Sequence, residues 1–201
     1  MVRHEYVRRQ VLKIYRAMPG IVFPVEPLSI FDSMKNCRVM SYQQMAEVLG
    51  DTVAAVVLAC ESESGCTQYT CDDDRYLTLY NASSDNNNVD GRIRWTLAHE
   101  LGHIILGHFS DMVVTHMEEN NFHSSAVCQK FEKEADFFAA TLLSPFPAFQ
   151  NYEIKSAYGI QSIFGLSDEA SRNRMDQYNK WLRTKVKTAW ENDIRKAIFG
   201  V

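Results

Sequence analysis

Residues 95–108, WTLAHELGHIILGH, limit the folds open to this chain more than any other stretch does. They are apolar nearly all round a helix, which predicts a helix buried in the core. Three of the six histidines of the chain also lie in this stretch. A buried glutamate and buried imidazoles are costly without a partner, so the fold has to supply one for these polar groups.

Within this stretch, His99 and His103 are four residues apart, so on a helix they project from one face, about 40° apart. Their imidazoles can converge on one ion, and Glu100 lies beside the open side of that ion. This is the H-E-x-x-H arrangement, in which two histidines bind zinc and the carboxylate accepts a proton from water. The plainer alternative is a buried helix with a satisfied core histidine and an exposed glutamate, and the apolar flanks argue against it.

A catalytic zinc takes three protein ligands and leaves one position open for water. On a continuous helix His108 lies about 140° round from His103 and about 180° from His99, so it does not reach the same ion. We therefore reject His108 as the third ligand. We expect it at the end of the helix, which Gly107 helps to terminate.

The third ligand is expected further along the chain, in EKEADFFAATLL. Glu132 and Asp136 are four apart and share one helix face, so Glu132 can bind the ion while Asp136 fixes the tautomer of His99 or His103. Glu134 is the rival ligand, but it points about 200° away from Glu132, so only one of them can face the metal. We favour Glu132 because it alone pairs with Asp136. The alternative is that both glutamates solvate a helix face.

The remaining patterns predict a mainly helical α+β domain with a small antiparallel sheet. Apolar spacing and punctuation predict helices near residues 6–18, 28–34 and 41–50. From about 52 to 80 the chain reads as strands, because TVAAVVLAC is rich in β-branched residues and RYLTLYN alternates. The zinc-binding helix is expected from Arg92 to Phe109, with Asp90 as its N-cap.

Composition and charge favour a soluble, reduced setting. Hydrophobic residues make up 46% and charged residues 23%, and the net charge of −4 gives no general drive toward nucleic acid or anionic membrane. No secretory signal is evident, and the five cysteines are an odd number, so we expect a cytoplasmic protein with no membrane association. Cys60, Cys66 and Cys71 lack a C-x-x-C pair and read as ordinary reduced cysteines.

Two stretches, RIRWTLAHELGHIILGH and EKEADFFAATLLSP, resemble the ImmA/IrrE family of zinc metallopeptidases. They are similar to the family's helix with H-E-x-G-H and to its later E-x-x-A-(N/D)-x-F-A-x-x-L-L-x-P. The chain departs from the family at Ser144, where methionine is usual, and at Asp136, where asparagine is frequent. The resemblance implies a gluzincin-like fold with Glu100 as general base and one catalytic Zn²⁺, whose ligands would be His99, His103 and Glu132.

The resemblance also implies a biological role that the residues by themselves do not show. It predicts an endopeptidase that cleaves a helix-turn-helix transcriptional repressor encoded by a mobile element, prophage or stress operon. A second hypothesis is a non-proteolytic anti-repressor with a structural zinc, and a third is a DNA-binding regulator. A structural zinc is usually closed by four protein ligands, so three ligands beside Glu100 favour the enzyme.

The division of the chain is predicted after residue 150, with a metallopeptidase domain at 1–150 and a helical region at 151–201. In the latter, IQSIFGLSDEASRNRM resembles a helix-turn-helix, and Arg172 and Arg174 are candidates for phosphate contacts. Given the net charge of −4, we favour a structural or repressor-docking role over DNA binding through residues 160–182.

Two details of catalysis stay open. The second stabiliser of the oxyanion is not identified, although Tyr80, His116 and His123 are candidates that are more often ordinary polar or packing residues. The strand RYLTLYN, at residues 75–81, is expected at a sheet edge, where it either pairs with an extended substrate or simply packs under the zinc helix.

Overall fold

The computed structural model describes the chain except for residues 19, 84–88, 111–125, 185–188 and 201. The chain forms two compact units, one made of Met1–Val25 with Ser124–Val201 and the other of Glu26–His123. The functional boundary after residue 150 stays a prediction. Both units are rich in helix and one contains a small sheet, so the predicted mainly helical α+β class is confirmed. None of the described helices is both long enough and apolar enough to cross a bilayer.

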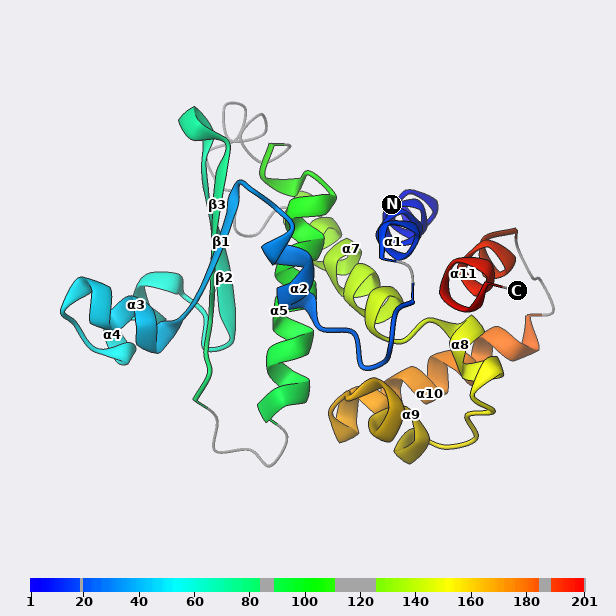
Figure 1. Cartoon of the computed structure of the whole chain (residues 1–201). Helices are drawn as coiled ribbons and strands as arrows, with labels where there is room; N and C mark the ends of the chain where they lie inside the picture. Colours follow the sequence, from blue (N-terminus) through cyan, green and yellow to red (C-terminus); the bar gives the residue numbers. More distant parts are fainter. Residues whose placement is uncertain (19, 84–88, 111–125, 185–188, 201) are drawn as a thin grey trace. The chain divides into compact units, whose positions relative to one another are not determined.

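In the unit of Met1–Val25 and Ser124–Val201, the regular elements that the structure describes are all helices (Figure 1). Its elements are α1 (His4–Ala17), α7 (Ala126–Leu143), α8 (Phe146–Asn151), α9 (Ala157–Phe164), α10 (Asp168–Arg183) and α11 (Ala189–Phe199). Helix α1 is amphipathic as predicted, because Val7, Val11 and Tyr15 repeat every four residues and are all fully buried. The Tyr15 hydroxyl donates to the carbonyl of Leu142, which ties α1 to α7.

Arg174 on α10 is a buried cation in this unit, not an exposed one. Its Nε and Nη2 donate to the carbonyl of Ser144 at 3.1 and 2.9 Å, and its guanidinium lies 3.9 Å from the ring centroid of Phe146. Burial lowers the pKa of Arg174 to about 9, so it stays protonated at neutral pH. The partial negative charge at the C-terminus of α7 compensates it. The prediction of a phosphate contact is therefore wrong for Arg174, because its guanidinium already caps a helix.

The second unit carries the sheet. Its elements are α2 (Pro27–Asp32), β1 (Cys37–Ser41), α3 (Tyr42–Leu49), α4 (Val53–Cys60), β2 (Gly65–Thr70), β3 (Arg75–Tyr80) and α5 (Val89–Ile105). The strand order is β1-β3-β2, with β1 parallel and β2 antiparallel to β3. The sheet is thus mixed where an antiparallel one was expected. The parallel strand β1 was missed, because its five residues carry no clear alternation.

Residues 53–60, predicted as a strand, form helix α4. The Thr52 side chain caps the helix by accepting from the amide of Ala55 at 3.2 Å. The residues that pack into the local core repeat at helical spacing, and they are Val53, Val56, Val57 and Cys60. Tertiary packing along this face outweighs the strand preference of the β-branched residues.

The two faces of the sheet pack against different helices. One face, with Leu77, Leu79 and Cys66, joins the core formed by α3 and α4. On the other face Gly65 lies against α5, because a Cβ placed there would meet Thr96 Cγ2 at 2.5 Å. Close approach of β2 to α5 therefore requires glycine at this position. Helix α5 begins at Val89, so Asp90 lies in its first turn and is not its N-cap.

We predict that Gly65→Ala lowers the free energy of unfolding by about 1–3 kcal/mol, because the new methyl group overpacks the contact between β2 and α5. Gly159→Ala in α9 is the matched control, since a Cβ there would meet its nearest neighbour, Ile154 Cδ1, at 3.4 Å. The control should be neutral or stabilising by at most about 1 kcal/mol. Urea unfolding followed by circular dichroism measures both, and equal effects would contradict the close approach.

Candidate metal centre

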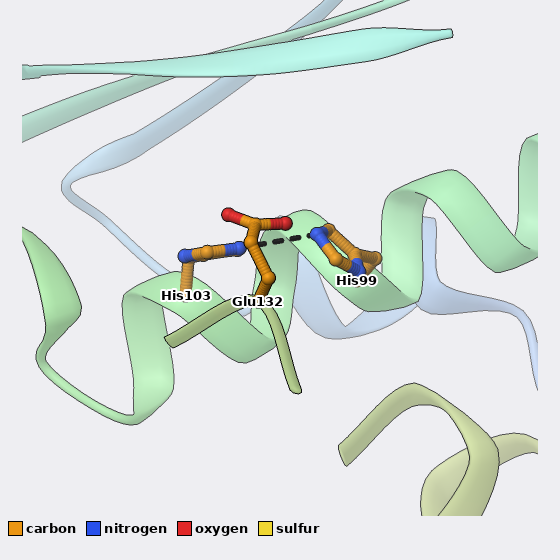
Figure 2. A group of neighbouring side chains, drawn as sticks. All are labelled: His99, His103 and Glu132. Atoms are coloured by element: carbon orange, nitrogen blue, oxygen red, sulfur yellow. Dashed lines mark hydrogen bonds between the residues drawn. The ribbon is translucent and has the colours of Figure 1, made fainter. Parts of the chain in front are cut away.

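The imidazoles of His99 and His103 meet on one face of α5 (Figure 2). Their Nε2 atoms are 3.1 Å apart and their ring centroids 4.9 Å apart. Two nitrogen ligands at 2.0–2.1 Å from a tetrahedral zinc lie about 3.3 Å from each other. The pair therefore has nearly the spacing that a shared ion requires, without any change of rotamer.

The surroundings of these imidazoles agree with the prediction of a buried helix. Leu97, Ala98 and Leu101 are at most 1% exposed, whereas His99 and Glu100 are only half-buried. The polar side of α5 is thus partly open, while its apolar residues are enclosed. A partly open polar strip on a buried helix is what a site for a metal and a substrate needs.

Glu132 completes a group that can hold a metal ion. One ligand atom each from His99, His103 and Glu132 lies within 4.8 Å of the others. Figure 2 shows the Glu132 carboxylate beside the two imidazoles. Two histidines and one glutamate are a known ligand set of catalytic zinc, so the donors fit that ion. Which residues bind metal in solution, and in which role, stays a prediction.

The rival ligand, Glu134, has another partner. Its carboxylate is fully buried and accepts from the Arg3 backbone amide at 2.7 Å and from the Arg3 guanidinium at 2.7 to 3.2 Å. Arg3 and Glu134 thus join the start of α1 to α7. Glu132 and Asp136 lie on a different, exposed face of α7. This arrangement favours Glu132 over Glu134 as the ligand, and the predicted support from Asp136 remains untested.

The carboxylate of Glu100 lies near the edge strand β2. Burial raises the pKa of the Cys66 thiol on β2, and both Cys60 and the negative charge of Glu100 raise it further. Cys66 is therefore a protonated, weakly nucleophilic thiol at neutral pH. None of the five cysteines, all of which lie in the part of the chain that the structure describes, forms a disulfide.

The strand at residues 75–80, β3, is the central strand of the sheet, so its predicted edge position is wrong. Alternation along one strand does not reveal which neighbours pair with it. Among the candidates for oxyanion stabilisation, Tyr80 ends β3 opposite Gly65, while His116 and His123 lie outside the described residues. The role of Tyr80 as an oxyanion stabiliser stays a prediction.

Two features near His103 were missed from the sequence. Phe109 lies 6.1 Å from the His103 ring centroid and continues into a ring cluster with Tyr76 and Tyr69. In addition, His108 contacts the His103 ring on the side away from His99. The tyrosines of β2 and β3 were a usable sequence signal for the ring cluster. The contact between His108 and His103 depends on a chain reversal after α5, which helical spacing does not reveal.

Comparison with known families agrees with this geometry. Residues 84–176 match the family model Peptidase_M78, the IrrE N-terminal-like domain. The matched range includes both histidines of α5, Glu100 and the three carboxylates of α7 considered above. No curated protein matches the sequence. The family match supports the assignment of this chain to the ImmA/IrrE family of peptidases.

Proposed function

We propose that the protein is a zinc-dependent endopeptidase that cleaves a helix-turn-helix transcriptional repressor in the cytoplasm. The observation that carries the enzymatic part is the group of His99, His103 and Glu132, with Glu100 on the same helix as the histidines. The peptidase family match supports the reaction class. The choice of a repressor as substrate rests on the resemblance of the sequence to ImmA/IrrE peptidases.

In this proposal, His99, His103 and Glu132 hold the ion, and Glu100 performs the proton transfers. Zinc at such a site supplies Lewis acidity toward a carbonyl and lowers the pKa of water from about 15.7 to about 7. Glu100 accepts the proton of the attacking water and later delivers it to the leaving amine. Its half-buried position lets it reach both substrate and solvent.

Strand β2 is the element that we propose for binding the substrate backbone. Within the part of the chain that the structure describes, β2 pairs with β3 on one side only. The charge of Glu100 reaches Cys66 in this strand, so a peptide added to its outer edge would pass close to the general base. Edge pairing recognises an extended backbone largely independently of its sequence. The ring cluster of Tyr69, Tyr76 and Phe109 would then contribute an apolar wall for one side chain.

Substitution of the two glutamates tests the proposed ligand set. Glu132→Gln should weaken zinc binding by at least about tenfold, because it replaces a charged ligand with a neutral one. Glu134→Gln is the matched control, and it should keep zinc affinity but lose about 1–3 kcal/mol of stability through the weakened contacts to Arg3. Chelator competition and urea unfolding measure the two effects. The opposite pattern would make Glu134 the ligand.

Substitution of Glu100 separates cleavage of the repressor from mere binding of it. Glu100→Gln should retain zinc and fold normally, yet lose about 10²- to 10⁴-fold in cleavage rate, because the amide does not accept a proton. The assay incubates wild type and variant with a candidate helix-turn-helix repressor, and gel electrophoresis detects the fragments. A reporter under that repressor provides a second readout. If the variant relieves repression as well as wild type does, the protein is an anti-repressor that acts by binding.

A further inference from the structure

His108 is a buried polar side chain that the proposed mechanism does not use. It is 0% exposed, and its Nδ1 lies 3.1 Å from Nδ1 of His103, within hydrogen-bonding distance. The two ring centroids are 4.9 Å apart and the ring planes are inclined by 79°. The nearly perpendicular rings indicate a directed contact between nitrogens, not a stacked pair.

A reversal of the chain brings His108 back to a ring five residues earlier. Helix α5 ends at Ile105, and the amides of Leu106 and Gly107 still donate to the carbonyls of Gly102 and Ile104. Gly107 then adopts φ +74°, in the left-handed region that favours glycine. A continuous helix would have turned His108 to the far side.

The proton arrangement at this contact follows from the metal ligand. The Nε2 atom of His103 faces Nε2 of His99, so it is the nitrogen available to an ion. A ligating nitrogen carries no proton, and neutral His103 therefore has its proton on Nδ1. In that tautomer the N–H of His103 would donate to Nδ1 of His108, whose own proton would then be on Nε2.

We propose that His108 is a positioning residue for His103, which it orients by accepting the hydrogen bond from Nδ1. This inference rests on the proposed metal site. The outer nitrogen of a zinc-bound histidine typically donates to a carboxylate, a carbonyl or water, and this contact fixes ring and tautomer. Here an imidazole just beyond the end of α5 serves as acceptor. It orients the ligand without adding a negative charge beside the ion.

His103 and His108 both belong to the unit of Glu26–His123. Asp136 was the residue expected from the sequence to fix a histidine tautomer. The structure assigns that function for His103 to His108. The ring of Phe109, with its centroid 6.1 Å from that of His103, is an apolar neighbour of this ligand.

The test compares two variants of similar size in the full-length protein. His108→Leu removes the acceptor, whereas His108→Asn places its Oδ1 where Nδ1 of the imidazole stood. We expect zinc affinity, measured by chelator competition, to fall about 10- to 100-fold for the leucine variant and to stay within about threefold of wild type for the asparagine variant. His4→Leu is the control for loss of a histidine outside the site, since His4 packs edge-on against Phe137.

A second readout does not require zinc. Proton–nitrogen NMR of the imidazoles in the zinc-free chain, at a pH of about 8, should show the His103 proton on Nδ1 in wild type and His108→Asn but not in His108→Leu. A proton on Nε2 of wild-type His103, or equal loss of affinity in both variants, would overturn the inference. A chain that shows the expected tautomer but binds no zinc would instead refute the proposed enzyme and leave the contact between the histidines in place.

Discussion

The 3.1 Å approach of two imidazole nitrogens on α5 is the interaction on which the rest of the site depends. At this distance the two nitrogens either share one proton in a hydrogen bond or bind one cation between them, so the pair is compatible with a metal. Two glycines shape the surroundings of this histidine pair. Gly65 lets the sheet approach α5, and Gly107 ends the helix one turn beyond His103.

Helix α7 carries its carboxylates on two faces. Glu134 lies on the buried face, and Glu132 and Asp136 lie on the exposed face. Glu134 is enclosed and held by the amide and guanidinium of Arg3, which satisfies a charge that would otherwise destabilise the core. That contact sets the rotation of α7 about its axis. Glu132 and Asp136 are consequently presented together on the outside. The contact between Arg3 and Glu134 therefore favours Glu132 over Glu134 as the candidate ligand.

Errors in the sequence interpretation have physical causes. Residues 53–60 were assigned to a strand from their β-branched content, although their packed residues follow helical spacing and Thr52 is a good cap. Strand β3 was expected at an edge but is central, because the residue pattern of one strand does not show which other strands pair with it. A continuous helix would turn His108 away from His103, but the left-handed Gly107 changes the direction of the chain after α5. The charge of Arg174 suggests a phosphate contact, but its guanidinium lies at the C-terminus of a helix.

The sequence by itself determined the buried helix, the convergence of His99 and His103, and the opposite orientations of Glu132 and Glu134 on α7. These follow from the 3.6-residue repeat, which is local and so can be read from spacing. Only the tertiary structure decided that β2 is an edge, that Glu134 is bound by Arg3, and that His108 returns to His103. Each of these depends on contacts between separate elements or on the direction that the chain takes after a helix. Neither is encoded in the periodicity of a single segment.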